Sequence, residues 1–230
     1  MDVADRLAGL ITELASRRQR LAVAVDGPDA AGKTTLAGRI ASRLGMPVIR
    51  AGADGFHLPR QARYRRGELS AEGYYRDSFD YQAITGQCLG PFRDGEPVIA
   101  TARYDFRADT TRDAGTEVPA SGVLIFDGVF LLRPELAGSW DLAIYLRVSP
   151  ETTLRRALAR DLGLFGSAEE VRRRYLGRYL PGQALYRAEA APQDTAHIAI
   201  GNDDPDHPVV IRWQPPGFSA REDAGQHGQS

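Results

Sequence analysis

LAVAVDGPDAAGKTT, residues 21–35, runs from an apolar segment through a glycine-rich turn into residues that can begin a helix. The spacing G-x-x-x-x-G-K-[ST], which is typical of a phosphate-binding loop, is met from Gly27 to Thr34. The apolar, β-branched run predicts a buried parallel strand over 21–25, and the apolar spacing that follows predicts a helix over 33–44. Strand, loop and helix in this order are the surroundings that such a loop requires.

The chemistry of this motif is phosphate binding. Its glycines let the backbone curl so that several N–H groups point at one phosphate, and the start of the helix adds a favourable dipole. Lys33 is predicted to neutralise the β and γ phosphates of a nucleotide, and the Thr34 hydroxyl is predicted to ligate Mg²⁺. The alternative is a chance glycine turn in front of an ordinary helix.

The single lysine of the chain lies inside this motif. Of the 29 lysines and arginines, only Lys33 is a lysine, which suits a place where a compact charge must reach between phosphates. A GTPase would need a second lysine in its guanine-reading N-K-x-D segment, so the ordinary GTPases are excluded. ATP-dependent kinases, ATPases and synthetases remain. The loop residues predicted to bind ATP are Gly27, Ala30, Ala31, Gly32, Lys33, Thr34 and Thr35.

The composition is that of a folded chain. With 230 residues, 43% of them hydrophobic and 26% charged, the chain can bury a substantial core. A formal net charge of −1 gives no general basic field, so we expect no nucleic-acid partner. The chain has no run of about 18 apolar residues and its N-terminus is charged, which predicts no membrane partner and a cytoplasmic location. Cys88, the only cysteine, can form neither an internal disulfide nor a cysteine-based metal site.

Strand-like and helix-like segments alternate along the chain. This order predicts an α/β fold of three layers, α/β/α, in which helices cover both faces of a mostly parallel sheet. We expect an N-terminal helix over 1–20, a single domain over 1–213 and a disordered tail over 214–230. Further strands are expected at 46–50, 97–100, 123–126, 142–148, 196–200 and 209–213, and further helices at 82–89, 151–162 and 168–179.

Two acidic residues follow predicted strands. Asp54 comes after the strand at 46–50, and Asp127 ends the strand at 123–126. Ligands of open parallel sheets bind beyond the carboxyl ends of the strands, so both are candidates for chemistry. Asp127 is placed to hold Mg²⁺ opposite Thr34, and Asp54 is free to accept the proton of a substrate hydroxyl. The alternative for each is a cap or turn residue.

Five segments taken together resemble the phosphoribulokinase and uridine kinase superfamily, over roughly residues 20–202. The resemblance implies a P-loop kinase fold, and an enzyme that moves the γ-phosphate of ATP onto a hydroxyl of a small metabolite. It implies that Asp54 is the general base, that Lys33 and Thr34 bind phosphate and Mg²⁺, and that Asp127 stands where uridine kinases usually have glutamate. The segments are GPDAAGKTT (27–35), ADGFH (53–57), YDF (104–106), FDG (126–128) and RRALARD (155–161).

The resemblance also implies a lid over 155–180 and a substrate-side insertion over 58–96. Arg156 and Arg160 lie four residues apart and would share one face of a helix. We expect Arg156 to bind ATP and Arg160 to act as a catalytic residue on the transferring phosphate. Their alternative is a solvated helix face with Arg160 paired to Asp161.

The acceptor is predicted to bind near the middle of the chain, at Phe56, His57, Arg63 and Tyr104. Here the sequence departs from the uridine kinases, because Asp109 stands where a histidine commonly follows the YDF triplet. The segment 73–80 resembles the pantothenate kinase branch instead. The arginines of 60–66 suit an anionic substrate, although a solvated loop is an equal alternative.

These observations predict an ATP- and Mg²⁺-dependent kinase of the uridine kinase-like group, with a nucleoside as the leading acceptor. The alternatives are a pantothenate or sugar kinase of the same superfamily, or a regulatory module that binds ATP without an acceptor. The sequence leaves open the identity of the small-molecule substrate and whether the chain forms a homo-oligomer.

Overall fold

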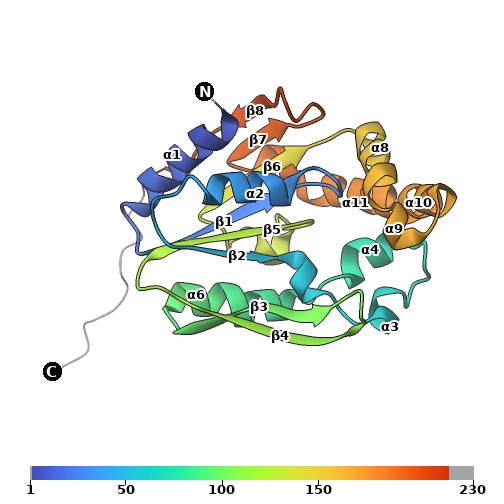
Figure 1. Cartoon of the computed structure of the whole chain (residues 1–230), viewed down its shortest axis with the longest axis horizontal. Coiled ribbons are helices and arrows are strands. Elements are labelled where there is room, and N and C mark those ends of the chain that lie inside the picture. The colour runs from blue at the N-terminus through green and yellow to red at the C-terminus, as the bar shows by residue number, and fades with distance from the viewer. Residues whose placement is uncertain (1, 218–230) are drawn as a thin grey trace.

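The computed structural model describes residues 2–217 and is built around one central sheet (Figure 1). Neighbouring strands of this sheet are parallel, except that the last two are antiparallel. The mostly parallel sheet expected from the sequence is confirmed. Within the described residues the six strands lie in the order β2 (Val48–Gly52), β5 (Gly122–Gly128), β1 (Arg20–Asp26), β6 (Leu142–Arg147), β7 (Ile198–Gly201) and β8 (Val209–Trp213).

Helices cover both faces of the sheet because alternate strand residues point to opposite sides. Val23 of β1 packs in a core cluster with residues of α1 (Val3–Ala15) and α2 (Lys33–Ala41), whereas Ala24 belongs to the cluster on the other face. The expected three-layer architecture is therefore present. Helices that contribute to the second cluster are α4 (Ala71–Asp77), α5 (Tyr81–Ala83), the π-helical η2 (Ile84–Leu89), α6 (Gly90–Asp94), α7 (Pro134–Ala137) and α11 (Leu180–Ala190).

A separate two-stranded ribbon lies beside the central sheet. It consists of β3 (Val98–Asp105) and β4 (Thr110–Glu117), which are antiparallel. The sequence predicted only a short edge strand at 97–100. The strand is longer, and it pairs with β4 instead of joining the sheet. β3 also packs against η1 (Ala53–Phe56), the short helix that follows β2.

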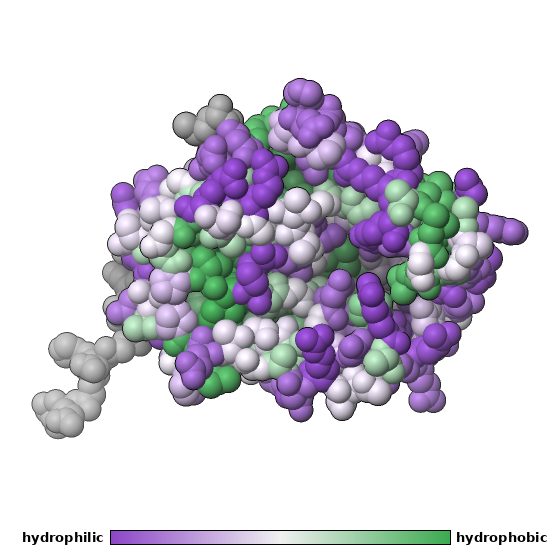
Figure 2. Space-filling model, viewed as in Figure 1, coloured by the Kyte–Doolittle hydropathy of each residue, from purple (hydrophilic) through white to green (hydrophobic). Residues whose placement is uncertain are grey.

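The segment expected to form a lid contains three helices that we call the arm. The segment has a small hydrophobic core of its own, formed by Ala157, Val171 and Tyr175. The surface is hollowed between the arm and the body of the molecule (Figure 2). The arm consists of α8 (Pro150–Arg160), α9 (Leu162–Phe165) and α10 (Ala168–Arg174). The last of these helices continues through the π-helical η3 (Tyr175–Tyr179) into α11, and α12 (Pro192–Thr195) then leads to β7.

Some boundaries differ from the expected ones. The N-terminal helix ends at Ala15 rather than at residue 20, because Arg20 already begins β1. The tail expected over 214–230 lies outside the described residues from 218 onward. Within residues 2–217, no helix combines the length and the apolar character needed to span a bilayer.

Candidate functional site

The phosphate-binding loop connects β1 to α2 and has the curled backbone that the motif predicts. Gly27, Ala30 and Gly32 all have positive φ angles, of 156°, 55° and 89°. A side chain at Gly27 would place its Cβ 2.7 Å from the carbonyl oxygen of Leu146, so this position requires glycine. Gly32 is the N-cap of α2, and the loop therefore presents its N–H groups at the start of a helix.

A buried carboxylate supports the loop from below. Asp26 is 0% exposed, and its Oδ1 accepts a hydrogen bond from the Gly27 backbone N–H at 2.7 Å. Its Oδ2 accepts a hydrogen bond from the hydroxyl of Tyr186, which itself accepts one from the Leu132 N–H at 3.0 Å. Burial raises the pKa of Asp26. This support could not be predicted from the sequence, because Tyr186 lies 160 residues away and carries no motif.

The single lysine lies across the loop. Lys33 Nζ donates to the carbonyl oxygen of Pro28 at 2.7 Å. Desolvation lowers the pKa of Lys33, and the nearby carboxylates, Asp29 foremost, counteract part of this effect. Asp29 accepts a hydrogen bond of 2.6 Å from the hydroxyl of Tyr74 on α4, which ties the loop to the substrate side. To contact a phosphate, the ammonium group must exchange the Pro28 carbonyl for a phosphate oxygen.

Thr34 and Asp127 come together at the carboxyl end of β5, as the sequence predicted. Thr34 Oγ1 donates to Asp127 Oδ2 at 2.6 Å, while Arg50 Nη2 on β2 donates to Asp127 Oδ1 at 2.9 Å. Arg50 thus occupies one carboxylate oxygen and leaves the other facing the threonine. Two adjacent hard oxygen donors fit the ligand preference of Mg²⁺. Arg50 was not identified from the sequence, because it lies within a segment that was interpreted only as a strand.

Asp54 lies in η1, just beyond the end of β2, with an exposed carboxylate. His57 Nε2 is 3.7 Å from Asp54 Oδ1, and the Nδ1 of the same ring lies 3.1 Å from the carbonyl oxygen of Ser78. Partial desolvation raises the pKa of Asp54, but His57 together with the charges of Lys33 and Arg160 outweighs it, and the net pKa lies below the ordinary value. The carboxylate is therefore ionised at neutral pH and can accept a proton.

Arg156 connects the arm to the loop. Its guanidinium donates to the carbonyl oxygens of Ala30 at 3.3 Å and Asn202 at 2.7 Å, while Asn202 Nδ2 donates to the Ala31 carbonyl at 2.8 Å. Beside these contacts lies a cavity of about 230 Å³ with apolar and polar walls. Its walls include Thr35, Leu36, Leu146, Arg156, Ile200 and Asn202.

Arg160 is paired with Asp161, which was the alternative to a role on the transferring phosphate. Its Nε donates to Asp161 Oδ1 at 2.6 Å, and its Nη2 donates to the Tyr175 hydroxyl at 3.2 Å. The positive charge of Arg160 nevertheless helps to lower the pKa of Asp54. An approach to a bound phosphate would require the side chain to leave Asp161.

The residues predicted to bind the acceptor separate into two groups. Phe56 is fully buried and packs against Phe126, and Arg63 is buried with its Nε donating to the Leu58 carbonyl at 2.8 Å. Both residues stabilise the fold, which corrects their assignment as substrate contacts. Tyr104 is half-buried, and its hydroxyl donates to Asp109 Oδ1 at 2.9 Å. His57 lies beside Asp54, and its contact with the acceptor stays a prediction.

Known proteins share the fold of this chain. Neither a protein-family model nor a curated protein sequence matches it. A possible uridine kinase from Bacillus stearothermophilus matches with a TM-score of 0.64 at 22% identity, over 84% of this chain and 98% of that one. A candidate fructose transport system kinase from Silicibacter sp. TM1040 matches with a TM-score of 0.68 at 24% identity, over 83% and 96%. D-glycerate 3-kinase from Cryptococcus neoformans matches with a TM-score of 0.58 at 12% identity, over 87% and 94%. The expected P-loop kinase fold is confirmed.

Proposed function

We propose that this protein is an ATP-dependent kinase that transfers the γ-phosphate of ATP to a hydroxyl group of a small metabolite. One observation carries the proposal: Lys33, Asp54 and the Thr34–Asp127 pair lie around one phosphate-binding loop, at the carboxyl ends of three neighbouring parallel strands. Solved structures with this fold include proteins described as kinases of different small molecules, which supports phosphotransfer as the reaction class.

The nucleotide would bind across the loop. Backbone N–H groups of the loop after Pro28, up to Thr34, and the Lys33 ammonium hold its phosphates, and the helix start of α2 adds to their attraction. The adenosine moiety extends into the cavity of about 230 Å³ beside Arg156 and Asn202. Apolar walls with a few polar groups suit a purine ring.

The transfer step uses Asp54 as base. The acceptor O–H bond breaks as its oxygen attacks the γ-phosphorus, and Asp54 takes the proton. The bond from the γ-phosphorus to the bridging oxygen breaks, and ADP leaves with the electron pair. Arg160, released from Asp161, is placed to stabilise the charge on the transferred group.

Thr34 and Asp127 would hold Mg²⁺, while Arg50 pairs with the other oxygen of the Asp127 carboxylate. When bound, the ion neutralises phosphate charge.

An acceptor screen tests the proposal. The full chain is incubated with Mg·ATP and nucleosides, pantothenate, sugars or hydroxy acids, and ADP release is followed. We expect at least one compound to stimulate turnover, and Asp54→Asn to reduce that turnover by about 10²- to 10⁴-fold while ATP binding persists. Asp113→Asn, on the exposed ribbon, is the matched control and should leave turnover unchanged. ATP binding without stimulation by any acceptor would contradict a kinase and favour a regulatory ATP-binding module.

A further inference from the structure

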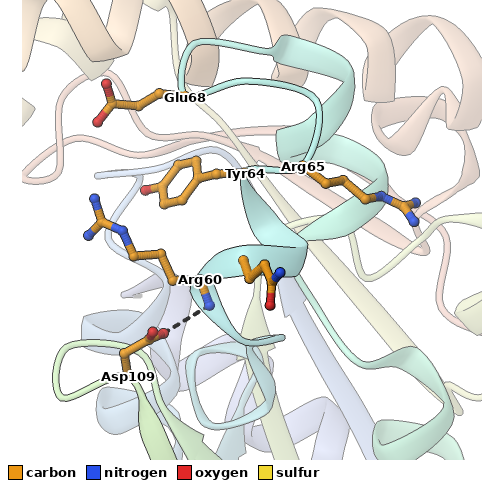
Figure 3. Close-up of a pocket in the computed structure, with 6 residues that line it drawn as sticks. Arg60, Tyr64, Arg65, Glu68 and Asp109 are labelled. Atoms are coloured by element: carbon orange, nitrogen blue, oxygen red, sulfur yellow. Dashed lines mark hydrogen bonds between the residues drawn. The ribbon is translucent and has the colours of Figure 1, made fainter.

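A second, larger cavity lies on the substrate side of the molecule, next to α3 (Arg60–Arg63). Its volume is about 600 Å³, large enough for a small metabolite. Figure 3 shows its lining side chains, which come from α3, the loop after it and the turn of the ribbon. These residues are Arg60, Gln61, Tyr64, Arg65, Glu68 and Asp109.

Most charges of this cavity are already paired. Asp109 Oδ1 accepts from Arg63 Nη2 at 3.3 Å, and Arg65 Nη2 donates to Asp77 Oδ1 at 2.5 Å. Glu68 forms ion pairs with two arginines of α10. The hypothesis that the arginines of 60–66 bind an anionic substrate therefore does not apply to Arg63 and Arg65, because their positive charges are compensated within the protein.

Arg60 differs from these arginines. Its backbone N–H donates to Asp109 Oδ1 at 2.9 Å, but among the described residues its guanidinium has no carboxylate partner. The guanidinium lies over the ring of Tyr64, 5.3 Å from the ring centre. In Figure 3 the Arg60 side chain extends toward the space beside Tyr64 and Glu68. Its planar fork of N–H donors is therefore available to a ligand.

A second cation, also without a carboxylate partner in the part of the chain that the structure describes, contacts the same ring. Arg178 of η3 is 2% exposed and 4.7 Å from the Tyr64 ring centre. Its guanidinium donates to backbone carbonyl oxygens, among them those of Arg63 and Ser70, both at 3.1 Å. Within residues 2–217 no carboxylate pairs with this buried guanidinium, so its charge adds a positive contribution to the potential at the Tyr64 ring, weakly screened by solvent.

A series of contacts links Asp54 to the element that carries Arg60. The ring of His57, which faces Asp54, lies 4.7 Å from the ring of Phe106 in the ribbon. The carbonyl oxygen of Phe106 in turn accepts from Arg63 Nη2 at 3.4 Å, at the end of α3. These contacts connect the surroundings of Asp54 to α3, whose first residue is Arg60.

We propose that the acceptor carries an acidic group, a carboxylate or a phosphate, and that this group binds Arg60 over the Tyr64 ring. The proposal rests on the proposed kinase function and names the class of its acceptor. Arg60 is thus a residue that determines specificity, and a neutral polyol or nucleoside lacks the group that this cavity recognises.

Matched acceptors test the proposal. Each neutral compound is assayed beside its acidic counterpart with Mg·ATP: glycerol and glycerate, pantothenol and pantothenate, ribose and ribose 5-phosphate. We expect the acidic member of at least one pair to have a kcat/KM at least tenfold higher, and the carboxylate and phosphate pairs show which acid is recognised. Binding of the same compounds is measured by calorimetry with ADP present, so that affinity is read independently of turnover.

The variant Arg60→Gln separates the two proposals. It should raise KM for the acidic acceptor about tenfold, with kcat and the KM for ATP changed less than twofold, whereas the exposed control Arg172→Gln should change none of them. Three results would overturn the acidic-acceptor inference and leave the kinase proposal standing. They are a preference for the neutral members, an unchanged KM for the acidic acceptor in Arg60→Gln, and no binding of the acidic member of any pair. Loss of ATP binding in the wild-type chain would instead overturn the kinase proposal.

Discussion

Removing the hydroxyl of Tyr186 should destabilise the protein by an amount that the contacts of Asp26 determine. The Tyr186→Phe variant deletes a hydrogen bond to a fully buried carboxylate, which is worth about 1.5–3 kcal/mol. It also leaves the buried Leu132 N–H without its acceptor, at a further cost of about 1–3 kcal/mol. We expect the free energy of unfolding to fall by about 2.5–6 kcal/mol at pH 8.

This loss should depend on pH. Burial raises the pKa of Asp26, and the hydroxyl of Tyr186 opposes that rise. Without the hydroxyl the folded-state pKa is higher still, so the folded variant holds its proton more tightly and loses stability as the pH rises through that pKa. The difference from the wild type should therefore be smaller at pH 5 than at pH 8.

The assay is urea denaturation followed by circular dichroism at both pH values. Tyr104→Phe is the matched control, because it removes a hydroxyl that donates to the exposed carboxylate of Asp109 and should cost less than about 1 kcal/mol. A Tyr186→Phe variant that loses no more stability than the control at pH 8, or whose loss is larger at pH 5, would show that the Tyr186 hydroxyl does not stabilise the Asp26 carboxylate.

Two further predictions concern the groups around the loop. Arg50→Gln removes a cation 2.9 Å from Asp127 Oδ1. The Mn²⁺ concentration that half-saturates the ATP complex should therefore fall about two- to fivefold, as measured by electron paramagnetic resonance. An unchanged or higher concentration would contradict Thr34 and Asp127 as the metal ligands. His57→Phe keeps an aromatic ring but removes the group that most lowers the pKa of Asp54, so the acid limb of kcat/KM for the acceptor should move to higher pH, and an unmoved limb would count against Asp54 as base.

The elements that were predicted correctly from the sequence have contiguous signals. The apolar run of β1 and the glycine spacing after it lie within fifteen residues, and both describe local geometry. The ribbon could not be predicted in this way, because β4 reads TTRDAGTE and has no apolar alternation. Its pairing with β3 comes from the backbone and includes two register shifts, neither of which leaves a pattern in the sequence.

The residues of the site divide in the same way, into those with a local sequence signal and those without one. The loop residues and the acids at the strand ends were found because motif spacing and strand ends place them. Tyr186 and Arg50 contact their carboxylates only through the fold, across 160 and 77 positions of the chain. Phe56 was misassigned because a phenylalanine next to an active-site segment can pack inward as readily as it can contact a ligand, and only its burial against Phe126 decides between the two.

The central claim is that the curled loop and its lysine bind the terminal phosphates of ATP. Titration calorimetry of the full chain with Mg·ATP tests it directly, with Lys33→Ala as the variant and Arg43→Gln, an exposed cation just beyond the end of the same helix, as the control. We predict saturable binding at one site, unchanged in the control and weakened about 10- to 100-fold in Lys33→Ala, because a charge-assisted hydrogen bond to phosphate is lost. Absence of saturable heat in the wild type, or equal affinity in the lysine variant, would contradict the claim.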